Sequence, residues 1–155
     1  MLLQPRKLHD LPTEEALRRV ASVSLGRLVY FARALPAVWP TTHLVDGELI
    51  VVLAHRDSAL CRGLRGSTIG EYVIAYEVDI FNGHLHTGWC VVVTGPVRFI
   101  NEEEVENRVD LDALRSRIPD WADAEDIALL GIRAEVVTGY ELGTDSDVGE
   151  LTSTA

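Results

Sequence analysis

The stretch LPAVWPTTHLVDGELIVVLAHRDSALCRGLR, from Leu35 to Arg65, decides the fold. Two runs of β-forming residues, 37–45 and 48–53, meet at Asp46-Gly47, a pair that is typical of tight hairpin turns. A short helix is expected to begin near Asp57, directly after the second strand. Its arginines would then lie beside the end of a strand, and this arrangement can bind an anionic ligand.

The composition limits the classes of protein to which the chain can belong. It has 155 residues, 47% hydrophobic and 25% charged, which fits one globular domain with a sizeable core. The net charge of −10 disfavours nucleic acid or an anionic membrane as a partner. The chain has no apolar run long enough to span a membrane and no signal-peptide core, so we expect a cytoplasmic protein. Cys61 and Cys90 show neither zinc nor disulfide spacing and are expected to be buried.

The remaining β-forming runs indicate a barrel. Strands are expected at 25–32, 69–81, 86–100 and 128–142, with a tight turn at Asn82-Gly83 and a bend at Gly95-Pro96. Pro40 indicates that its strand lies at an edge or contains a bulge. With the central hairpin this makes six strands, joined mostly by short turns. The pattern favours a mainly β protein, a six-stranded antiparallel split β-barrel with flanking helices, over a doubly wound sheet.

Helices and less ordered segments are expected around this barrel. Thr13 is expected to cap a covering helix, and Asn101 a second helix that runs to Ile118 with a break near Asp110. Residues 1–10 are expected to form a loose N-terminal arm and 11–142 the barrel domain. The polar residues 143–155 are expected to be disordered.

The order of several segments resembles a known family. These are GRLVYFA, LPAVWPTTHLVDGELIVVL, RDSALCRGLRG, TGWCVVVTGPVRFI and IRAEVVTGYEL, and together they look like the pyridoxamine 5′-phosphate oxidase-like family of flavin-binding split barrels. The resemblance spans residues 11–142. It implies a homodimer with two cofactor sites at the subunit interface. It also implies FMN as the cofactor, or, as in some branches, the deazaflavin F420 or haem.

The resemblance implies a set of cofactor-binding residues. Carried over by position, it places the flavin ring beside Trp39, Pro40, Thr41 and Thr42, the ribityl chain near Val52 and Leu53, and the phosphate among Arg56, Ser58, Ala59 and Arg62. Trp89 is a further candidate, either packing on the cofactor across the dimer interface or serving as a core or interface tryptophan.

The chain departs from the family at the expected phosphate site. The family commonly has a lysine where this chain has Ala59, and the single lysine here is Lys7 in the N-terminal arm. Either Arg56, Arg62 or Arg65 supplies that charge, or the phosphate site is weak or lost. Arginine is chemically suited to the role, because its planar guanidinium binds phosphate oxygens in pairs.

The functional expectation is a flavin- or deazaflavin-dependent oxidoreductase that acts on a small molecule, with the chemistry carried by the cofactor and no catalytic side chain. P-loop, Rossmann and nucleophile-elbow motifs are absent. The histidines lack the spacing of a metal site, although one of them can serve as an acid–base group or a haem ligand; they are His43, His55, His84 and His86. A non-catalytic cofactor- or ligand-binding dimer of the same fold, motivated by Ala59, remains the alternative, and haem binding is a minor one.

Overall fold

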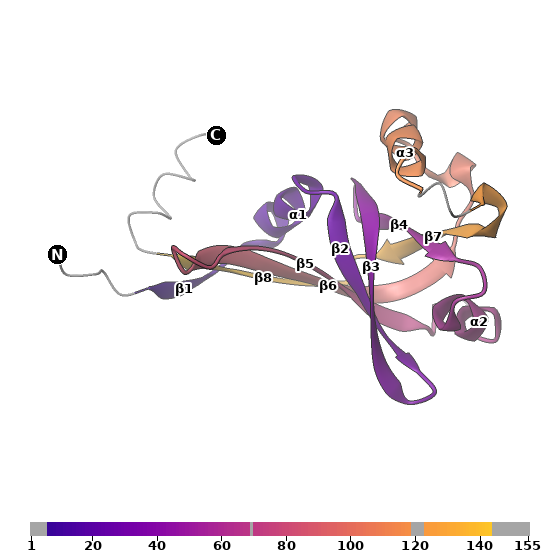
Figure 1. Ribbon diagram of the computed structural model, residues 1–155, viewed down its shortest axis with the longest axis horizontal. Coiled ribbons are helices and arrows are strands. Elements are labelled where there is room, and N and C mark those ends of the chain that lie inside the picture. The colour runs from indigo at the N-terminus through magenta and orange to yellow at the C-terminus, as the bar shows by residue number, and fades with distance from the viewer. Residues whose placement is uncertain (1–5, 69, 119–122, 144–155) are drawn as a thin grey trace.

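The computed structural model describes residues 6–68, 70–118 and 123–143, which form a mainly β structure (Figure 1). Its strands are β1 (Lys7–Asp10), β2 (Leu25–Ala32), β3 (Leu35–Asp46), β4 (Leu49–His55), β5 (Val73–Asn82), β6 (Thr87–Phe99), β7 (Ile127–Arg133) and β8 (Val136–Gly143). Its helices are α1 (Thr13–Ala21), α2 (Ala59–Arg65) and α3 (Arg108–Arg115), with the short 3-10 helices η1 (Glu102–Glu104) and η2 (Ala124–Asp126).

The strands close into a barrel. In the described part of the chain every strand pair is antiparallel, and the order is β1-β8-β6-β5-β2-β3-β4-β7, with β7 returning to pair with β6. The circuit from β6 through β5, β2, β3 and β4 to β7 contains six strands, so the expected six-stranded antiparallel barrel is confirmed. Strands β8 and β1 lie outside this circuit and extend the sheet from β6 into a long arm (Figure 1).

Two long strands each belong to two sheets, which splits the barrel. Strand β3 pairs with β2 as far as Thr42 and with β4 from His43 onward. Strand β6 pairs with β8 as far as Thr94 and with β7 from Val97 onward. The predicted bend at Gly95-Pro96 coincides with this second change of partner. The first change of partner leaves part of β3 uncovered, and this positions the candidate site described below.

Two hydrophobic clusters pack on opposite faces of β4. Ile50, Val52 and Ala54 point into the barrel, where α1 and α2 close the core. Val51 and Leu53 point to the other face, where they pack with Leu111 and Leu114 of α3. Because both faces are covered, β4 reads in the sequence as a continuous apolar run rather than as an alternating strand.

Several expectations about the segments were wrong in detail. Residues Lys7–Asp10 are not loose, because they form β1 and pair with β8. The last expected strand, 128–142, is two strands, β7 and β8, separated at Ala134-Glu135. These two differences raise the strand count from six to eight within the described residues. The expected disordered tail lies outside the described residues from position 144 onward.

The caps and turns were predicted with mixed success. Asn101 caps η1 through a capping box with Glu104, as expected, but the break was predicted near Asp110 and lies at 105–107, before α3 begins. Helix α1 begins at Thr13, but its N-cap is Pro12 and no side chain caps it. At the end of β5 the turn is longer than the predicted tight turn, and the Asn82 side chain accepts the N–H groups of His84 and Leu85.

Candidate functional site

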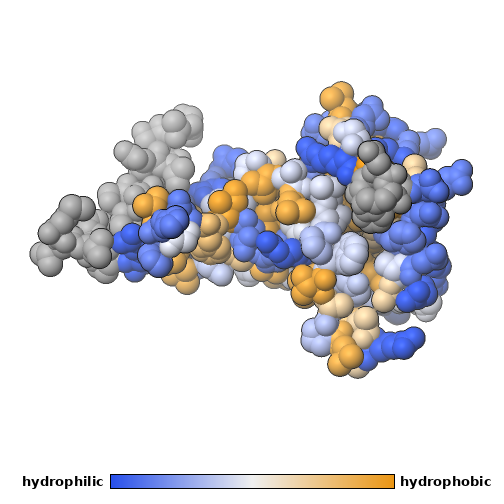
Figure 2. Space-filling view, in the orientation of Figure 1, coloured by the Kyte–Doolittle hydropathy of each residue, from blue (hydrophilic) through white to orange (hydrophobic). Residues whose placement is uncertain are grey.

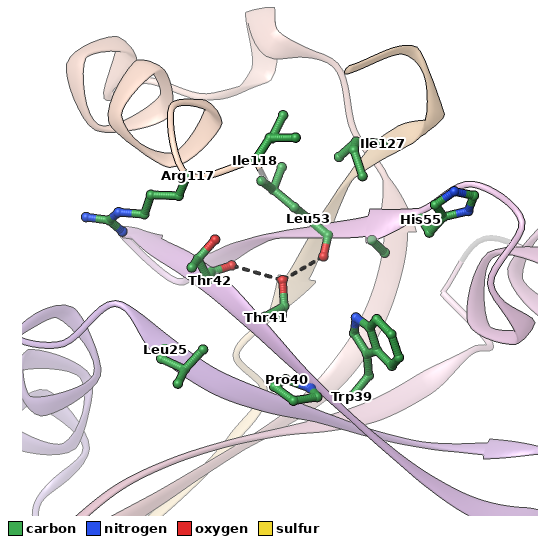
Figure 3. A pocket seen from close by; sticks show the side chains of 11 residues that line it. Leu25, Trp39, Pro40, Thr41, Thr42, Leu53, His55, Arg117, Ile118 and Ile127 are labelled. Atoms are coloured by element: carbon green, nitrogen blue, oxygen red, sulfur yellow. Dashed lines mark hydrogen bonds between the residues drawn. The ribbon is translucent and has the colours of Figure 1, made fainter. Parts of the chain in front are cut away.

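A hollow of about 330 Å³ lies where β3 leaves β2 and crosses to β4 (Figure 3). We call it the edge pocket. Its walls come from the start of β2, the middle of β3, the end of β4, the segment after α3 and the start of β7. It is lined by Leu25, Trp39, Pro40, Thr41, Thr42, Leu53, Ala54, His55, Arg117, Ile118 and Ile127. Most of these side chains are apolar, so the pocket suits a largely apolar ligand held by a few polar groups.

The backbone of β3 supplies some of those polar groups. Residues 35–42 pair with β2 on one side, and among the described residues no strand covers their other edge. Thr41 links this edge to β4, because its hydroxyl donates to the carbonyl of Leu53 at 2.7 Å. Trp39 is 52% exposed and stands beside the pocket (Figure 3). An uncovered strand edge with an aromatic wall can bind a ring that has polar atoms along one side.

A buried hydrogen-bond network supports the wall of the edge pocket. His43 is 3% exposed, and its Nε2 lies 2.7 Å from the carbonyl of Val20. Because a carbonyl only accepts, Nε2 carries the proton, and Nδ1 accepts from the Tyr76 hydroxyl at 2.7 Å. The same hydroxyl lies 3.2 Å from the carbonyl of Thr41. The network therefore ties α1, β3 and β5 together directly behind the pocket.

Burial sets the protonation states in this network. Burial lowers the pKa of His43 below its usual value. The hydrogen bond to the Val20 carbonyl opposes this shift, and the positive charge of Arg117 adds to it. Burial also raises the pKa of Tyr76 far above its usual value. Both groups are therefore neutral near pH 7, and the network provides support rather than a charge.

Two polar side chains mark the ends of the edge pocket. His55 and Arg117 lie at opposite ends in the close view (Figure 3). His55 Nδ1 accepts the N–H of Asp57 at 3.1 Å, which leaves Nε2 for a ligand. Arg117 is exposed, and within the described residues its guanidinium forms no ion pair with a carboxylate. The pocket can therefore hold an apolar ring with polar or anionic groups at its ends.

The arginines after β4 lie around α2. Ser58 caps this helix by accepting the N–H of Cys61. Arg56 donates to the carbonyl of Glu125 at 2.6 Å, and Arg62 donates to the carbonyl of Asp57 at 2.7 Å. Each guanidinium has further N–H donors, and neither forms an ion pair with a described carboxylate. Both side chains can still bind an anion.

The structure brings together only part of the site expected from the sequence. Trp39, Pro40, Thr41, Thr42 and Leu53 line the edge pocket. Val52 points into the core beside it, whereas Ala59 and Arg62 line a second hollow with residues of the β2–β3 hairpin. Trp89 lines neither hollow, because it is buried in the core with the guanidinium of Arg19 5.9 Å from its ring.

Several residues of the edge pocket were not predicted from the sequence. Ala54 and His55 continue β4 directly after Leu53, so the position of the strand was the signal that could have indicated them. Leu25, Arg117, Ile118 and Ile127 come from other parts of the chain, and for the last three no local pattern indicates a place beside β3. Leu25 meets the pocket through the β2–β3 pairing, where it lies opposite Thr42, and Ile127 meets it through the pairing of β7 with β4.

No group of three or more histidine, cysteine, aspartate or glutamate side chains in the described part of the chain could hold a metal ion. No helix found there has both the length and the apolar character needed to cross a membrane.

Comparison with known proteins identifies the family. The model of the pyridoxamine 5′-phosphate oxidase family matches residues 12–141. The uncharacterized protein Rv0080 of Mycobacterium tuberculosis is 31% identical over 141 residues, which are 91% of this chain and 90% of that protein. An FAD-binding protein of Mesorhizobium loti has a TM-score of 0.71 at 18% identity, over 90% of this chain and 99% of that chain. An FAD- and heme-binding protein of Mycobacterium smegmatis has a TM-score of 0.63 at 14% identity, over 96% of this chain and 80% of that chain. The chain belongs to the pyridoxamine 5′-phosphate oxidase family and has a split-barrel fold.

Proposed function

We propose that this protein binds a flavin in the edge pocket and acts as a flavin-dependent oxidoreductase on a small molecule. The observation that carries the proposal is the uncovered edge of β3 from Trp39 to Thr42, which lines an apolar pocket directly beside the arginine-bearing α2 segment. The family membership and the two FAD-binding structural relatives support the choice of cofactor.

The residues present fit such a cofactor. The pocket volume, about 330 Å³, lies within the range of small-molecule sites, and its lining is mostly apolar. Trp39 offers a flat surface, and the β3 edge offers N–H and C=O groups for the heteroatoms of a ring. A bound flavin supplies hydride or electron transfer, so the chain itself needs to bind, orient and exclude water. Ile118 and Ile127 would exclude water from the pocket, and His55 and Arg117 would orient polar groups at its ends.

Arg56 and Arg62 would hold the phosphate of the flavin in place of the lysine that is absent at Ala59. Each charge-assisted contact contributes about 1.5 to 3 kcal/mol, so Arg56→Ala or Arg62→Ala should weaken FMN binding about tenfold to a hundredfold. Riboflavin lacks the phosphate and should bind both variants as well as it binds the parent protein. Titration of both ligands, followed by flavin fluorescence, measures this difference.

The controls separate a lost contact from a packing defect. Arg18→Ala changes an exposed arginine on α1 and should leave both affinities unchanged. Equal losses for FMN and riboflavin would mean that the substitution disturbs the fold around α2. If the parent protein binds neither ligand, and F420 fails as well, the flavin proposal is wrong.

The alternative is a non-catalytic dimer of the same fold that stores a cofactor or senses a ligand, and the missing lysine at Ala59 is the observation that favours it. A bound flavin that stays oxidised in the presence of NADH, NADPH and small-molecule donors would support this alternative. The absorption spectrum of the purified protein separates FMN, F420 and haem. Haem is disfavoured at His43, because both of its ring nitrogens already form hydrogen bonds.

We also propose that the protein is a homodimer. A row of side chains crosses the outer face of the sheet, through neighbouring strands, from Val38 to Val29, Ala75, Thr94 and Val136. Its two ends are exposed and its middle is half-buried. Further hydrophobic residues lie on the projecting β2–β3 hairpin, where Figure 2 shows hydrophobic residues on the surface. An apolar surface of this kind is typical of an interface between subunits.

A further inference from the structure

A second hollow lies between the tip of the β2–β3 hairpin and α2. Its volume is about 610 Å³, and Phe31 and Arg33 of the hairpin, Arg62 and Gly63 of α2, and Tyr72 are among its lining residues. We call it the hairpin hollow. It shares no lining residue with the edge pocket. Helix α2 contacts β2, and Figure 1 shows this helix beside the hairpin.

The hairpin hollow has two positive charges and no negative one. None of its lining residues is acidic, and within the described chain neither Arg33 nor Arg62 forms an ion pair with a carboxylate. Arg62 donates one hydrogen bond to the carbonyl of Asp57 and keeps its other donors. Two unneutralised guanidinium groups in a protein of net charge −10 select an anion, and their planar donors suit phosphate oxygens.

The hollow also offers aromatic surface. Phe31 is 67% exposed at the hairpin, and the Tyr72 hydroxyl donates to the carbonyl of Phe31 at 3.2 Å. Helix α2 approaches this tyrosine closely, because a Cβ on Gly63 would lie 3.1 Å from the Tyr72 hydroxyl oxygen. A planar base can stack on such rings whatever its identity. Phosphate-binding arginines beside stacking aromatics fit a nucleotide better than a simple anion.

The two hollows flank the same short connection. His55 lines the edge pocket, and Ala59 lines the hairpin hollow. Only three residues, 56–58, separate them in the chain. We propose that the hairpin hollow binds the adenylate half of FAD while the flavin ring lies in the edge pocket, with Arg62 beside the phosphates that join the two halves, so that the protein prefers FAD to FMN. This inference rests on the proposed flavin site.

Arg33 is the residue that tests the inference, because it lines only the hairpin hollow and is not part of the proposed FMN phosphate site. Its φ of 51° lies in the left-handed region, which asparagine tolerates. Arg33→Asn therefore removes the charge without opposing the turn. Ala34→Asn is the matched control, since Ala34 is the neighbouring turn residue with a φ of 63°. Both variants and the parent protein are titrated with FAD, FMN and riboflavin.

The parent protein should bind FAD about tenfold more tightly than FMN, and Arg33→Asn should remove about tenfold of the FAD affinity while leaving FMN and riboflavin unchanged. Ala34→Asn should bind all three flavins like the parent. ADP should compete with FAD but not with riboflavin.

Each other result would overturn the inference. Equal affinities for FAD and FMN would show that the hairpin hollow does not bind the adenylate half. The proposed flavin site would be unaffected by that result. A similar loss for all three flavins in Arg33→Asn would indicate a disturbed hairpin. ADP that binds without displacing FAD would mean that the hollow takes a separate nucleotide. Failure of all three flavins to bind the parent protein would instead refute the proposed function itself.

Discussion

Gly26 shows how one residue shapes the wall of the edge pocket. A Cβ at this position would lie 2.5 Å from the hydroxyl oxygen of Tyr76, so only glycine leaves room for that hydroxyl. The hydroxyl then reaches both His43 and the carbonyl of Thr41. Buried polar groups are costly unless they are satisfied, so this network fixes the position of β3 where it changes partner.

The buried histidine should make stability depend on pH. Burial lowers the pKa of His43 in the folded protein, whereas in the unfolded chain it returns to about 6.5. Below that pH the unfolded chain binds a proton on this histidine, and the folded protein does not. The contribution of His43 to the free energy of unfolding is therefore present above about pH 6.5 and is lost as the pH falls. The slope attributable to one such group is at most about 1.4 kcal/mol per pH unit.

Urea unfolding of the parent protein and His43→Gln, between about pH 5 and pH 7.5, measures this slope. The free energy of unfolding should fall more steeply toward acid pH in the parent than in the variant. Titratable groups that both proteins share contribute equally to both pH dependences. If the free energy of unfolding changes with pH in the same way in the parent and the variant, His43 does not contribute to the pH dependence.

At the scale of the element, the pairing of β6 depends on the segment between β7 and β8, which passes close to it. A Cβ on Gly95 would lie 1.7 Å from the carbonyl oxygen of Arg133, at the point where β7 ends. The N–H of Glu135 then donates to the carbonyl of Thr94 at 3.2 Å, just before β8 begins. Because this segment crosses β6 at Gly95, β6 pairs with β8 before the bend and with β7 after it.

Gly95→Ala should destabilise the protein by about 3 kcal/mol, near the upper end of the cost of overpacking, because the atom in its way belongs to the backbone. Gly83→Ala is the control, since nothing lies within 4 Å of a Cβ at that exposed turn. Its effect should stay within about 0.5 kcal/mol. Chemical denaturation of both variants gives the comparison, and a small effect of Gly95→Ala would mean that the crossing can relax.

The same elements show what the sequence could and could not predict. Strand β2 has the predicted bounds, because a compact run of β-forming residues and its flanks define it locally. The separation of β7 from β8 was missed, because it depends on contact with Gly95, a residue far away in the chain. For the same reason Trp39 to Thr42 were predicted at the pocket, whereas Arg117 and Ile127 were not.

At the scale of the whole molecule, the arm in which β8 and β1 extend the sheet from β6 is one layer thick over much of its length (Figure 1). Helix α1 packs on one of its faces. On the other face, Arg27 forms ion pairs with Glu77 and Asp79 next to the row from Val38 to Val136, which is apolar apart from Thr94. An apolar row beside a fixed pattern of charges suits a specific interface, because charge placement sets the register while apolar burial supplies the attraction.

The proposed interface predicts that the protein is a dimer in solution. Light scattering should give a mass of twice the 17.1 kDa of one chain at micromolar concentration. Val38→Glu should shift the protein toward the monomer, because it buries a charge within the proposed interface. Val38 is 59% exposed in the single chain, so the substitution should leave the fold intact. Leu85→Glu is the matched control, because Leu85 is 57% exposed in the turn between β5 and β6, away from the row. A monomeric parent protein would contradict the dimer, and a Val38→Glu variant that stays dimeric would place the interface on another surface.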